Sequence, residues 1–416
     1  MKFRSILVAR NISKIASVIF FFLLLFSVVL LIPQDQKTVM SKGVPDFLAQ
    51  NPRPGYAMRH IENNDTSPLQ REEQALSILG TTNTTKLPPE LYRLAKQVFD
   101  ELPGEYLPGY KSSCWMTKKN APGVGRLRCL PYFYILGVAK CGTSDLWDKI
   151  VAHPHVVRKL VKEPHWWTRY RLQGIPFDKY LQKRSASLVR SYKEDSSNKL
   201  THIVGDGSAS TLWDNRHWKK TFAALVKEGP KYVTADIIRA AQPNAKLFVI
   251  LRDPVSRLYS DYIYFHDNPD QEIFHNAAVH TIANFGRCTK ARSPRACAYT
   301  LSIQDGVRLN IGLYSVYIRD WLKAFPRDQI FILRLEDWHS GCEGLLPRLY
   351  AFLNLKILTK VQISDICQTR TRNTNTRKAS EVGGMFNETR TILQEFYSEW
   401  NRDLSNLLGD TRFLWQ

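Results

Sequence analysis

Residues 134–144 of the chain read Tyr-Ile-Leu-Gly-Val-Ala-Lys-Cys-Gly-Thr-Ser. An apolar run followed by glycines, a lysine and two hydroxyl residues is typical of a strand, a loop and the first turn of a helix. Glycines let the backbone approach an anion closely, and the first N–H groups of a helix have no partner within the helix, so they can bind that anion. The segment therefore predicts an anion-binding loop made of Lys140, Cys141, Gly142, Thr143 and Ser144.

The position of the lysine separates this loop from the phosphate-binding loop of nucleoside triphosphatases. In those proteins the lysine directly follows the second glycine, whereas Lys140 stands two residues before Gly142. A kinase or nucleoside triphosphatase is also disfavoured because the sequence offers no clear partner for Mg²⁺. An ordinary strand-to-helix turn with a surface lysine is the alternative interpretation of the same residues.

Strands and helices alternate around this loop and toward the C-terminus. Such alternation indicates a parallel sheet with helices on both faces, which here predicts an α/β fold of the P-loop-like type. Ligands bind such sheets at the carboxyl ends of the strands, so residues that follow strands are candidates for the site. The expected strands are 132–138, 203–206, 245–251 and 329–335, and the expected helices are 144–152, 255–265 and 345–353.

A second charged segment follows the strand expected at 245–251. Arg252 comes first, Pro254 can begin a helix, and Ser260 stands two turns into that helix. The planar guanidinium of Arg252 can bind a phosphate through two hydrogen bonds, and Ser260 can donate to the same group. An Arg–Asp pair that closes a strand–helix corner is the alternative. Two such segments, each after a strand, are far more specific together than either one alone.

The order Gly-x-x-Lys-x-Gly-Thr and then Arg-Asp-Pro-x-x-Arg-x-x-Ser resembles the two halves of the site for 3′-phosphoadenosine-5′-phosphosulfate (PAPS) in sulfotransferases. The likeness to glycosaminoglycan sulfotransferases continues from Cys129 to Phe413 and includes residues 162–167, 205–215, 312–317 and 333–337. It is most similar to family members that act on C6 of N-acetylgalactosamine 4-sulfate in chondroitin or dermatan sulfate. The resemblance implies PAPS-dependent transfer of a sulfuryl group to a glycosaminoglycan hydroxyl, with no metal ion required.

More distantly, the chain is similar to heparan sulfate 3-O- and N-sulfotransferases. Their Glu, placed two residues before a His and an aromatic pair, corresponds to Glu163, which the resemblance implies is the general base. A base is needed because the acceptor hydroxyl has a very high pKa, and Lys140 would stabilise the charge that develops on the leaving phosphate. Several heparan enzymes carry a lysine after the residue that corresponds to Asp206, whereas this chain has Gly207 and Ser208.

Acceptor contacts are expected from His165, Trp166, Trp167 and Asp206, and each of these residues has an alternative role. His165 could brace a loop, the two tryptophans could belong to the core, and Asp206 could hold Lys140 or the loop around Trp213 in place. Glu163 itself could merely form an ion pair with Lys162 or Arg169. Near the C-terminus a basic segment is typical of a solvated surface, but by resemblance it closes over the nucleotide through Arg377 and Lys378.

An apolar run near the N-terminus predicts a membrane anchor. Residues 15–32 have no charged side chain, and their number approaches what a bilayer-spanning helix needs. Basic residues precede the run, so the positive-inside rule places the N-terminus in the cytosol. A cleaved signal peptide is the alternative, but its apolar core is usually about 7–15 residues long. The predicted parts are a cytosolic tail (1–14), a transmembrane signal anchor (15–32), a luminal stem with a short helix at 90–101 (33–108) and a catalytic domain (109–416).

This topology places the catalytic domain in the Golgi lumen, and two features agree with it. Acceptor triplets for N-glycosylation begin at Asn64, Asn83 and Asn387. The seven cysteines show no spacing suited to zinc, and in an oxidising lumen an odd number indicates bridges plus one free thiol. We expect Cys141 to be free because it lies in the anion-binding loop. The expected local bridges are Cys288–Cys297, which the resemblance includes, Cys114–Cys129 and Cys342–Cys367.

The formal net charge of +20 indicates an acidic partner. Nucleic acid, an anionic membrane and an acidic polysaccharide all satisfy that condition, but a luminal domain disfavours nucleic acid. A heparan sulfate O-sulfotransferase is the alternative enzyme. A non-catalytic, membrane-anchored protein that binds sulfated polysaccharide is the rival of another class, and the presence of Lys140, Glu163, Arg252 and Ser260 argues against it. The sequence leaves the oligomeric state open, including a homodimer.

Overall fold

The computed structural model describes residues 87–117, 125–194, 201–215, 218, 227–301, 306–369 and 376–415. The predicted tail and anchor, and the predicted stem as far as residue 86 with Asn64 and Asn83, lie outside these ranges. Within them, no helix combines the length and the apolar character that crossing a membrane requires. The anchor, the glycosylation of these two residues and the homodimer therefore stay predictions.

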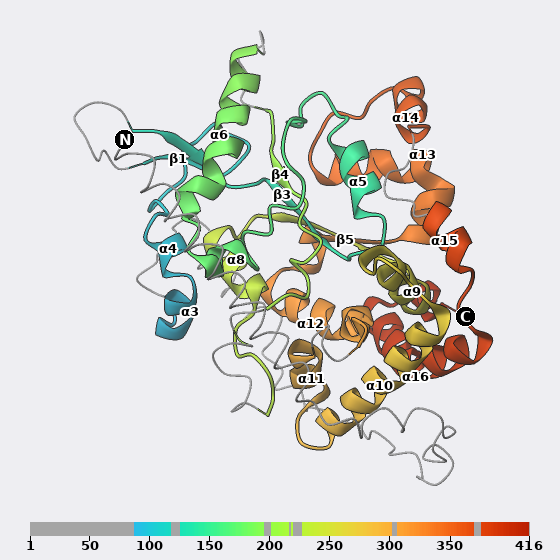
Figure 1. Cartoon of the computed structure of the whole chain (residues 1–416). Coiled ribbons are helices and arrows are strands. Elements are labelled where there is room, and N and C mark those ends of the chain that lie inside the picture. The colour runs from blue at the N-terminus through green and yellow to red at the C-terminus, as the bar shows by residue number, and fades with distance from the viewer. Residues whose placement is uncertain are drawn as a thin grey trace, which may run out of the picture. The chain divides into compact units, whose positions relative to one another are not determined.

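A four-stranded parallel sheet forms the centre of the fold (Figure 1), which confirms the predicted sheet. The strands lie in the order β4-β3-β5-β6, and Phe133 of β3 stands opposite Gly205 on one side and Lys246 on the other. Nearly all residues of the two central strands are apolar and buried, as expected for a parallel sheet that is covered on both faces. The strands are β3 (Phe133–Gly137), β4 (Gly205–Asp206), β5 (Lys246–Leu251) and β6 (Ile330–Arg334).

Helices cover both faces of this sheet. In Figure 1, α5 and α13 lie on one side of it and α8 and α12 on the other. Three helices begin within six residues of the end of a strand: α5 after β3, α9 after β5 and α13 after β6. The helices around the sheet are α5 (Thr143–Ile150), α6 (Phe177–Glu194), α8 (Thr234–Ala241), α9 (Pro254–Phe265), α10 (Gln271–Thr289), α11 (Pro294–Thr300), α12 (Tyr314–Ala324), α13 (Leu335–Phe352), α14 (Lys360–Cys367), α15 (Thr376–Val382) and α16 (Asn387–Leu408).

Two predicted helices differ from the observed ones. The helix expected at 345–353 is only the second half of α13, which begins directly after β6 and is kinked at Gly341. The helix expected at 90–101 consists of two short helices, α3 (Pro89–Leu94) and α4 (Lys96–Phe99). Val98 and Phe99 are buried in the main core, and the Arg171 guanidinium donates to the Leu94 carbonyl. This last part of the predicted stem therefore packs against the main core of the fold.

All three expected disulfides are present, and Cys141 is a free, buried thiol, which confirms the predicted pairing. Cys114–Cys129 joins β1 (Cys114–Met116) to its antiparallel partner β2 (Leu127–Cys129). Cys288–Cys297 joins α10 to α11, and Cys342–Cys367 joins α13 to α14.

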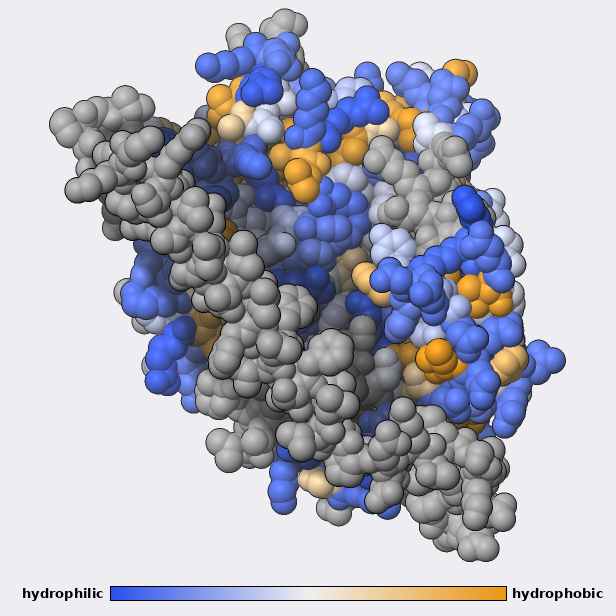
Figure 2. Space-filling model, viewed as in Figure 1, coloured by the Kyte–Doolittle hydropathy of each residue, from blue (hydrophilic) through white to orange (hydrophobic). Residues whose placement is uncertain are grey.

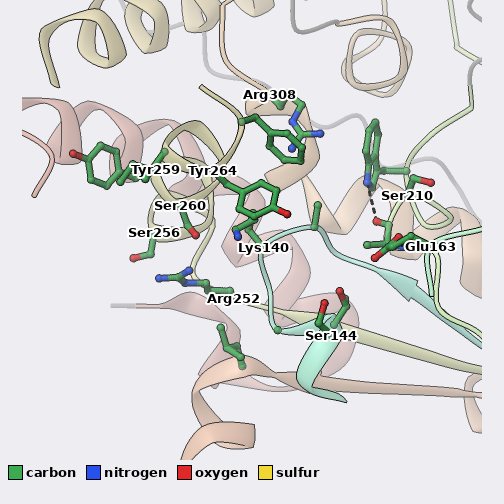
Figure 3. Close-up of a pocket in the computed structure, with 18 of the residues that line it drawn as sticks. Lys140, Ser144, Glu163, Ser210, Arg252, Ser256, Tyr259, Ser260, Tyr264 and Arg308 are labelled. Carbon is green, nitrogen blue, oxygen red and sulfur yellow. Dashed lines mark hydrogen bonds between the residues drawn. The ribbon is translucent and has the colours of Figure 1, made fainter. Parts of the chain in front are cut away.

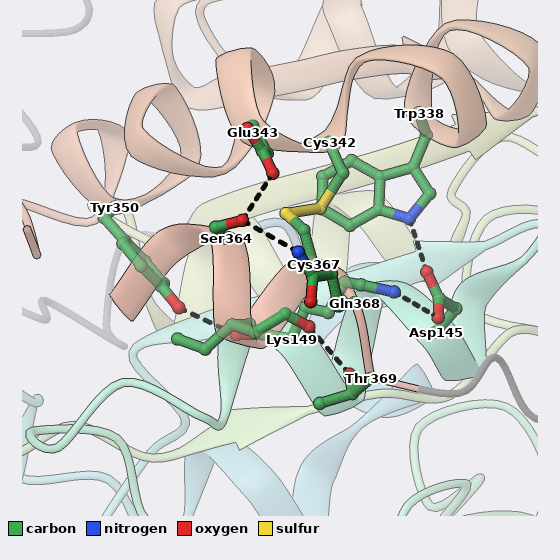
Figure 4. Close-up of a disulfide and its surroundings, with 11 residues drawn as sticks. Asp145, Lys149, Trp338, Cys342, Glu343, Tyr350, Ser364, Cys367, Gln368 and Thr369 are labelled. Carbon is green, nitrogen blue, oxygen red and sulfur yellow. Dashed lines mark hydrogen bonds and ion pairs between the residues drawn. A yellow bond between two sulfur atoms is a disulfide. The ribbon is translucent and has the colours of Figure 1, made fainter. Parts of the chain in front are cut away.

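Hydrogen bonds beside the last disulfide fasten α13 to α5, the helix that follows the anion-binding loop (Figure 4). Trp338 donates to the Asp145 carboxylate at 2.7 Å, and the Tyr350 hydroxyl donates to the Lys149 carbonyl at 2.8 Å. Asp145 and Lys149 also form a buried ion pair on α5. The loop thus leads into a helix, α5, whose position is fixed by hydrogen bonds to α13. On the face shown in Figure 2, the described surface is predominantly hydrophilic, and hydrophobic residues form small separate groups.

Candidate active site

A cavity of about 1140 Å³ lies at the carboxyl ends of β3 and β5, where the sequence predicts the site. In Figure 3, Arg252, Ser256 and Ser260 lie at one end, which we call the arginine end. Glu163 and Ser210 lie at the other end. We call these two residues and His165, which also lines the cavity, the glutamate end. Lys140 lies between the two ends. The structure therefore brings both predicted anion-binding segments and the predicted base around one space.

The predicted loop lines this cavity through Lys140, Gly142, Thr143 and Ser144. Gly142 precedes the first residue of α5 with φ +83°, where a side chain would be strained, and a Cβ there would lie 2.5 Å from Leu335 Cδ1. Because glycine has no side chain, it supplies no cap to the first N–H groups of α5. These groups are the ones a helix N-terminus offers to an anion.

Lys140 lies in a partly buried position beside this loop. Its ammonium group is 3.8 Å from the centre of the Tyr264 ring, a distance typical of a cation–π contact. Burial lowers the pKa of Lys140 to about 8; Arg252 adds to this lowering, and Asp261 opposes it. An anion bound in the cavity would favour the charged form and raise this pKa again.

At the arginine end, α9 begins in the way the sequence predicts. The Asp253 carboxylate accepts hydrogen bonds from the amides of Val255 and Ser256, and so caps the helix. This cap orients the first turns of α9, whose Ser256 and Ser260 line the cavity with Arg252. Within the described chain, the Arg252 guanidinium has no hydrogen bond or ion pair. A cation of this kind on a cavity wall is suited to binding a phosphate.

At the glutamate end, one carboxylate is surrounded by hydrogen-bond donors. Glu163 Oε2 accepts from the Ala209 amide at 2.8 Å and lies 3.3 Å from His165 Nε2, while Oε1 pairs with Lys162. His165 Nδ1 is 2.8 Å from Ser210 Oγ. Burial lowers the pKa of His165 below its usual value, so this imidazole is predominantly neutral near pH 7. The predicted alternative of an ion pair with Lys162 is thus present, yet Glu163 also faces the cavity.

Backbone strain is concentrated at this site. Three of the five non-glycine residues with positive φ in the described chain are Lys140, Glu163 and His165, at +66°, +62° and +46°. Such conformations persist only where the surrounding structure enforces them, and they cluster at functional sites. Here the His165 amide donates to Ser208 Oγ, which donates to the Asp206 carboxylate. This buried chain of hydrogen bonds holds the segment that carries the glutamate end.

Three predicted acceptor contacts need correction. Asp206 is 1% exposed, does not line the cavity, and accepts hydrogen bonds from Ser208 and Tyr180. Trp166 and Trp167 are 2% and 1% exposed and pack in an aromatic cluster with Phe177 and Tyr180. Their large apolar rings are buried beneath the site because α6 covers them. All three residues support the glutamate end from below and have no surface toward an acceptor.

Other predicted residues do not reach the cavity either. The Cys141 side chain is buried against the Tyr314 hydroxyl at 3.7 Å, and its amide donates to the Val138 carbonyl. Burial raises the pKa of this thiol to about 12. Arg377 and Lys378 belong to α15. Arg377 is exposed and pairs with Glu381, and Lys378 donates to the His266 carbonyl at the end of α9. Residues 370–375, which precede α15, lie outside the described residues.

Sequence patterns did not predict several residues that line the cavity. Ser256 stands one helical turn before Ser260, and this spacing could have indicated it. Trp213 and Arg308 had no such signal, because tertiary packing alone brings them to the site. Within the described residues, no group of three or more His, Cys, Asp or Glu could hold a metal ion. Further lining residues are Arg169, Trp213, Tyr259, Tyr264, Phe265, Arg308, His339 and Arg390.

Comparisons with known proteins agree with the geometry. A family model described as sulfotransferase domain matches residues 131–404. Carbohydrate sulfotransferase 15 from Homo sapiens is 34% identical over 394 residues, which cover 80% of this chain and 70% of that protein. Heparan sulfate glucosamine 3-O-sulfotransferase 3B1 from Mus musculus is 28% identical over 229 residues, or 55% of this chain and 47% of that protein. A solved sulfotransferase from Alicyclobacillus acidocaldarius aligns with 68% of this chain and 96% of its own, at 20% identity and a TM-score of 0.42.

Proposed function

The chain belongs to the sulfotransferase family, and on this premise we propose that it transfers a sulfuryl group from PAPS to a hydroxyl group of a glycosaminoglycan. The acceptor position that we propose is C6 of N-acetylgalactosamine 4-sulfate in chondroitin or dermatan sulfate. The resemblance to sulfotransferases that modify this position supports that choice. The net charge of +20 supports a polyanionic acceptor in general and does not distinguish one glycosaminoglycan from another.

The observation that carries the proposal is the cavity with cations at one end and a carboxylate at the other. The residues present fit PAPS: the Arg252 guanidinium, with Ser260 beside it, is suited to the 3′-phosphate. Lys140 and the first amides of α5 are suited to the 5′-phosphosulfate. When bound, PAPS supplies the sulfuryl group and leaves with the electron pair of the broken sulfur–oxygen bond as the 3′,5′-bisphosphate (PAP).

The chain's own residues then have distinct tasks. Glu163 accepts the proton of the acceptor hydroxyl as that oxygen bonds to sulfur. The Ala209 amide and His165 fix the Glu163 carboxylate, so the base is oriented before the acceptor arrives. Lys140 lies between the two ends of the cavity, and Lys162 donates to Thr143 Oγ1 at the start of α5. Both therefore place positive charge near the leaving phosphate, which gains negative charge. Positioning and charge stabilisation supply most of the catalysis in transfers of this type.

A heparan sulfate O-sulfotransferase is the second candidate, supported by the similarity over 229 residues. One local feature weighs against it. Several heparan enzymes carry a lysine at the position of Gly207, but a Cβ there would lie 2.7 Å from Trp147 Cε3. A lysine contact to the acceptor cannot be made from this position, so the acceptor must be bound differently.

For localisation, we propose a type II Golgi membrane protein with a luminal catalytic domain. The uncharged run at 15–32 supports an anchor. Three disulfides fit an oxidising compartment. Asn387 is exposed at the start of α16, where a glycan has room, although Thr389 of the same triplet is buried against His275. Release of N-glycans from the cell-made protein, together with its N-terminal sequence, tests this topology.

The test of the activity is direct. The predicted luminal part, from residue 33 onward with its disulfides formed, is incubated with radiolabelled PAPS and a panel of desulfated and sulfated chondroitin, dermatan and heparan chains. We expect label on C6 of N-acetylgalactosamine 4-sulfate, identified after enzymatic digestion to disaccharides. Label on heparan chains alone would replace the proposed acceptor with the second candidate. Absence of transfer to every chain, despite PAP binding, would favour the non-catalytic binding protein.

A further inference from the structure

Arg308 is a cavity residue that the proposed reaction does not use. Its Nε donates to Asp261 Oδ2 at 2.7 Å, and its Nη2 donates to Asp261 Oδ1. Asp261 is 3% exposed, on the buried side of α9. The side chain of Arg257 is fully buried, lies 3.7 Å from Asp261 and donates to the Arg308 carbonyl at 2.9 Å. Two guanidinium groups thus share one carboxylate, which leaves one net positive charge at the cavity wall.

The arrangement leaves part of the Arg308 guanidinium available for a ligand. Nε and Nη2 are used by Asp261, whereas Nη1 donates to no atom of the described residues. The side chain is 16% exposed and lines the cavity. Because the buried carboxylate already fixes the guanidinium plane, an anion that binds it causes little further loss of side-chain entropy. Arg308 is therefore a pre-oriented anion-binding group.

Arg308 lies apart from two of the groups assigned to PAPS, Arg252 and Ser144. In Figure 3, Tyr264 and Lys140 lie between Arg308 and Ser144, the first turn of α5. It also lies away from the Arg252 side chain in this view. A group held by Arg308 would thus lie across the cavity from the start of α5, on the side that we assign to the acceptor.

Two exposed aromatic rings accompany this arginine. The Phe265 ring centre is 4.1 Å from Arg308 Cζ, and Phe265 and Tyr264 are 52% and 42% exposed. Both line the cavity at the end of α9. Aromatic faces that border a cavity are suited to stacking on the apolar face of a sugar ring. An exposed ring next to a pre-oriented cation matches a sugar that carries an acidic substituent.

We propose that Arg308, with Phe265 and Tyr264, forms a subsite that binds an acidic substituent of the acceptor chain next to the reacting hydroxyl. The inference rests on the proposed function and deepens it, since it names residues that recognise a chemical group of the acceptor. The substituent is a sulfate ester on the modified sugar or a carboxylate on the neighbouring uronic acid. Both present oxygens that a guanidinium can bind in the same way.

The experiment compares Arg308→Gln with the unchanged protein on three acceptors. These are chondroitin 4-sulfate, desulfated chondroitin, which keeps only carboxylates, and carboxyl-reduced chondroitin 4-sulfate, which keeps only sulfate. Loss of one charge-assisted contact should raise KM about 10- to 100-fold for acceptors that carry the bound group. A rise confined to the two sulfated chains identifies the sulfate, and a rise confined to the two carboxylated chains identifies the carboxylate. PAP affinity, measured by calorimetry, should stay unchanged.

A matched control separates binding from folding. Arg295 pairs with the buried carboxylate of Asp320 at 2.9 and 3.0 Å but does not line the cavity. Arg295→Gln should therefore lower the melting temperature and leave the KM values for all three acceptors unchanged. Phe265→Ala serves as a second variant because Phe265 is exposed and no buried charge is disturbed. It should raise KM about 2- to 5-fold, the size of an exposed cation–π contact.

Two results would overturn the subsite. One is an unchanged KM for all three acceptors in both Arg308→Gln and Phe265→Ala. The other is an equal loss of kcat on every acceptor with weaker PAPS binding, since Arg308 would then contact the sulfuryl group. A failure of the proposed function is visible separately, because the unchanged protein would then transfer sulfate to none of the three chains.

Discussion

The two ends of the cavity are built in different ways. The arginine end consists of Arg252, Ser256 and Ser260, which lie within nine consecutive residues at one strand–helix corner and follow from the cap of α9. The glutamate end combines Glu163 and His165, which both have positive φ on irregular backbone, with Ser210, which is 45 residues beyond His165. Binding a phosphate needs only a cation and free donors at a corner. Holding a base requires a buried network that enforces an unfavourable backbone.

The largest effect that we expect separates chemistry from binding at the glutamate end. Glu163→Gln keeps the shape of the side chain but cannot accept a proton, so kcat should fall about 10²- to 10⁴-fold. PAP affinity should stay nearly unchanged, because the arginine end is intact. Steady-state rates and calorimetry measure the two quantities. Glu90→Gln, which removes an exposed partner of Lys231, is the matched control. If Glu163→Gln keeps normal turnover, His165 becomes the candidate base.

The next prediction distinguishes a tryptophan that stabilises the core from one that contacts the acceptor. Trp166→Ala should lower the free energy of unfolding by about 3–5 kcal/mol, because it leaves a cavity in the aromatic cluster. Trp213 is only partly buried and lines the active-site cavity. Trp213→Ala should cost less stability and raise KM for the acceptor. Urea unfolding and acceptor titration distinguish the two variants. An undiminished stability of Trp166→Ala would contradict its place in the core.

A smaller effect is expected at the arginine end. Arg252→Ala should remove the proposed charge-assisted contact to the 3′-phosphate. Such a contact is worth about 1.5–3 kcal/mol, so PAP affinity should fall about 10- to 150-fold. Arg377→Ala is the matched variant, because Arg377 is 93% exposed and pairs only with Glu381 among the described residues. It should change PAP affinity by less than about twofold. A large loss in Arg377→Ala would instead support the sequence prediction that this segment closes over the nucleotide.

The smallest expected effect is a pH dependence of PAP binding that comes from Lys140. Its pKa is lowered to about 8, and the protonated form binds the anion. Near pH 7 Lys140 is protonated, so PAP affinity should change little there and fall by up to about tenfold per pH unit above 8. The fall ends where pH passes the higher pKa of the bound state. Calorimetry at pH 7, 8 and 9 measures this, and Lys140→Met should abolish the dependence. A flat profile for the unchanged protein would place Lys140 away from the nucleotide.

Much of the fold was predictable because it depends on local patterns. The four strands, the helices that follow β3 and β5, and the parallel sheet follow from apolar runs and their spacing. Helix boundaries were less predictable: α13 continues through the kink at Gly341, and the helix expected at 90–101 is broken at Ala95. Packing against the sheet and the core decides these boundaries, and sequence patterns do not encode that packing.

The sequence by itself determined the loop with Lys140 and Gly142 and the corner with Arg252 and Ser260, because each is a short continuous segment whose geometry is local. It also indicated Glu163 through resemblance. Only the tertiary structure decided that Trp166 and Asp206 lie beneath the site and that Arg308 lies in it. The physical reason is that burial and contact between distant segments arise from how the whole chain packs. An aromatic or charged residue has the same identity in a core, in a supporting network and on a cavity wall.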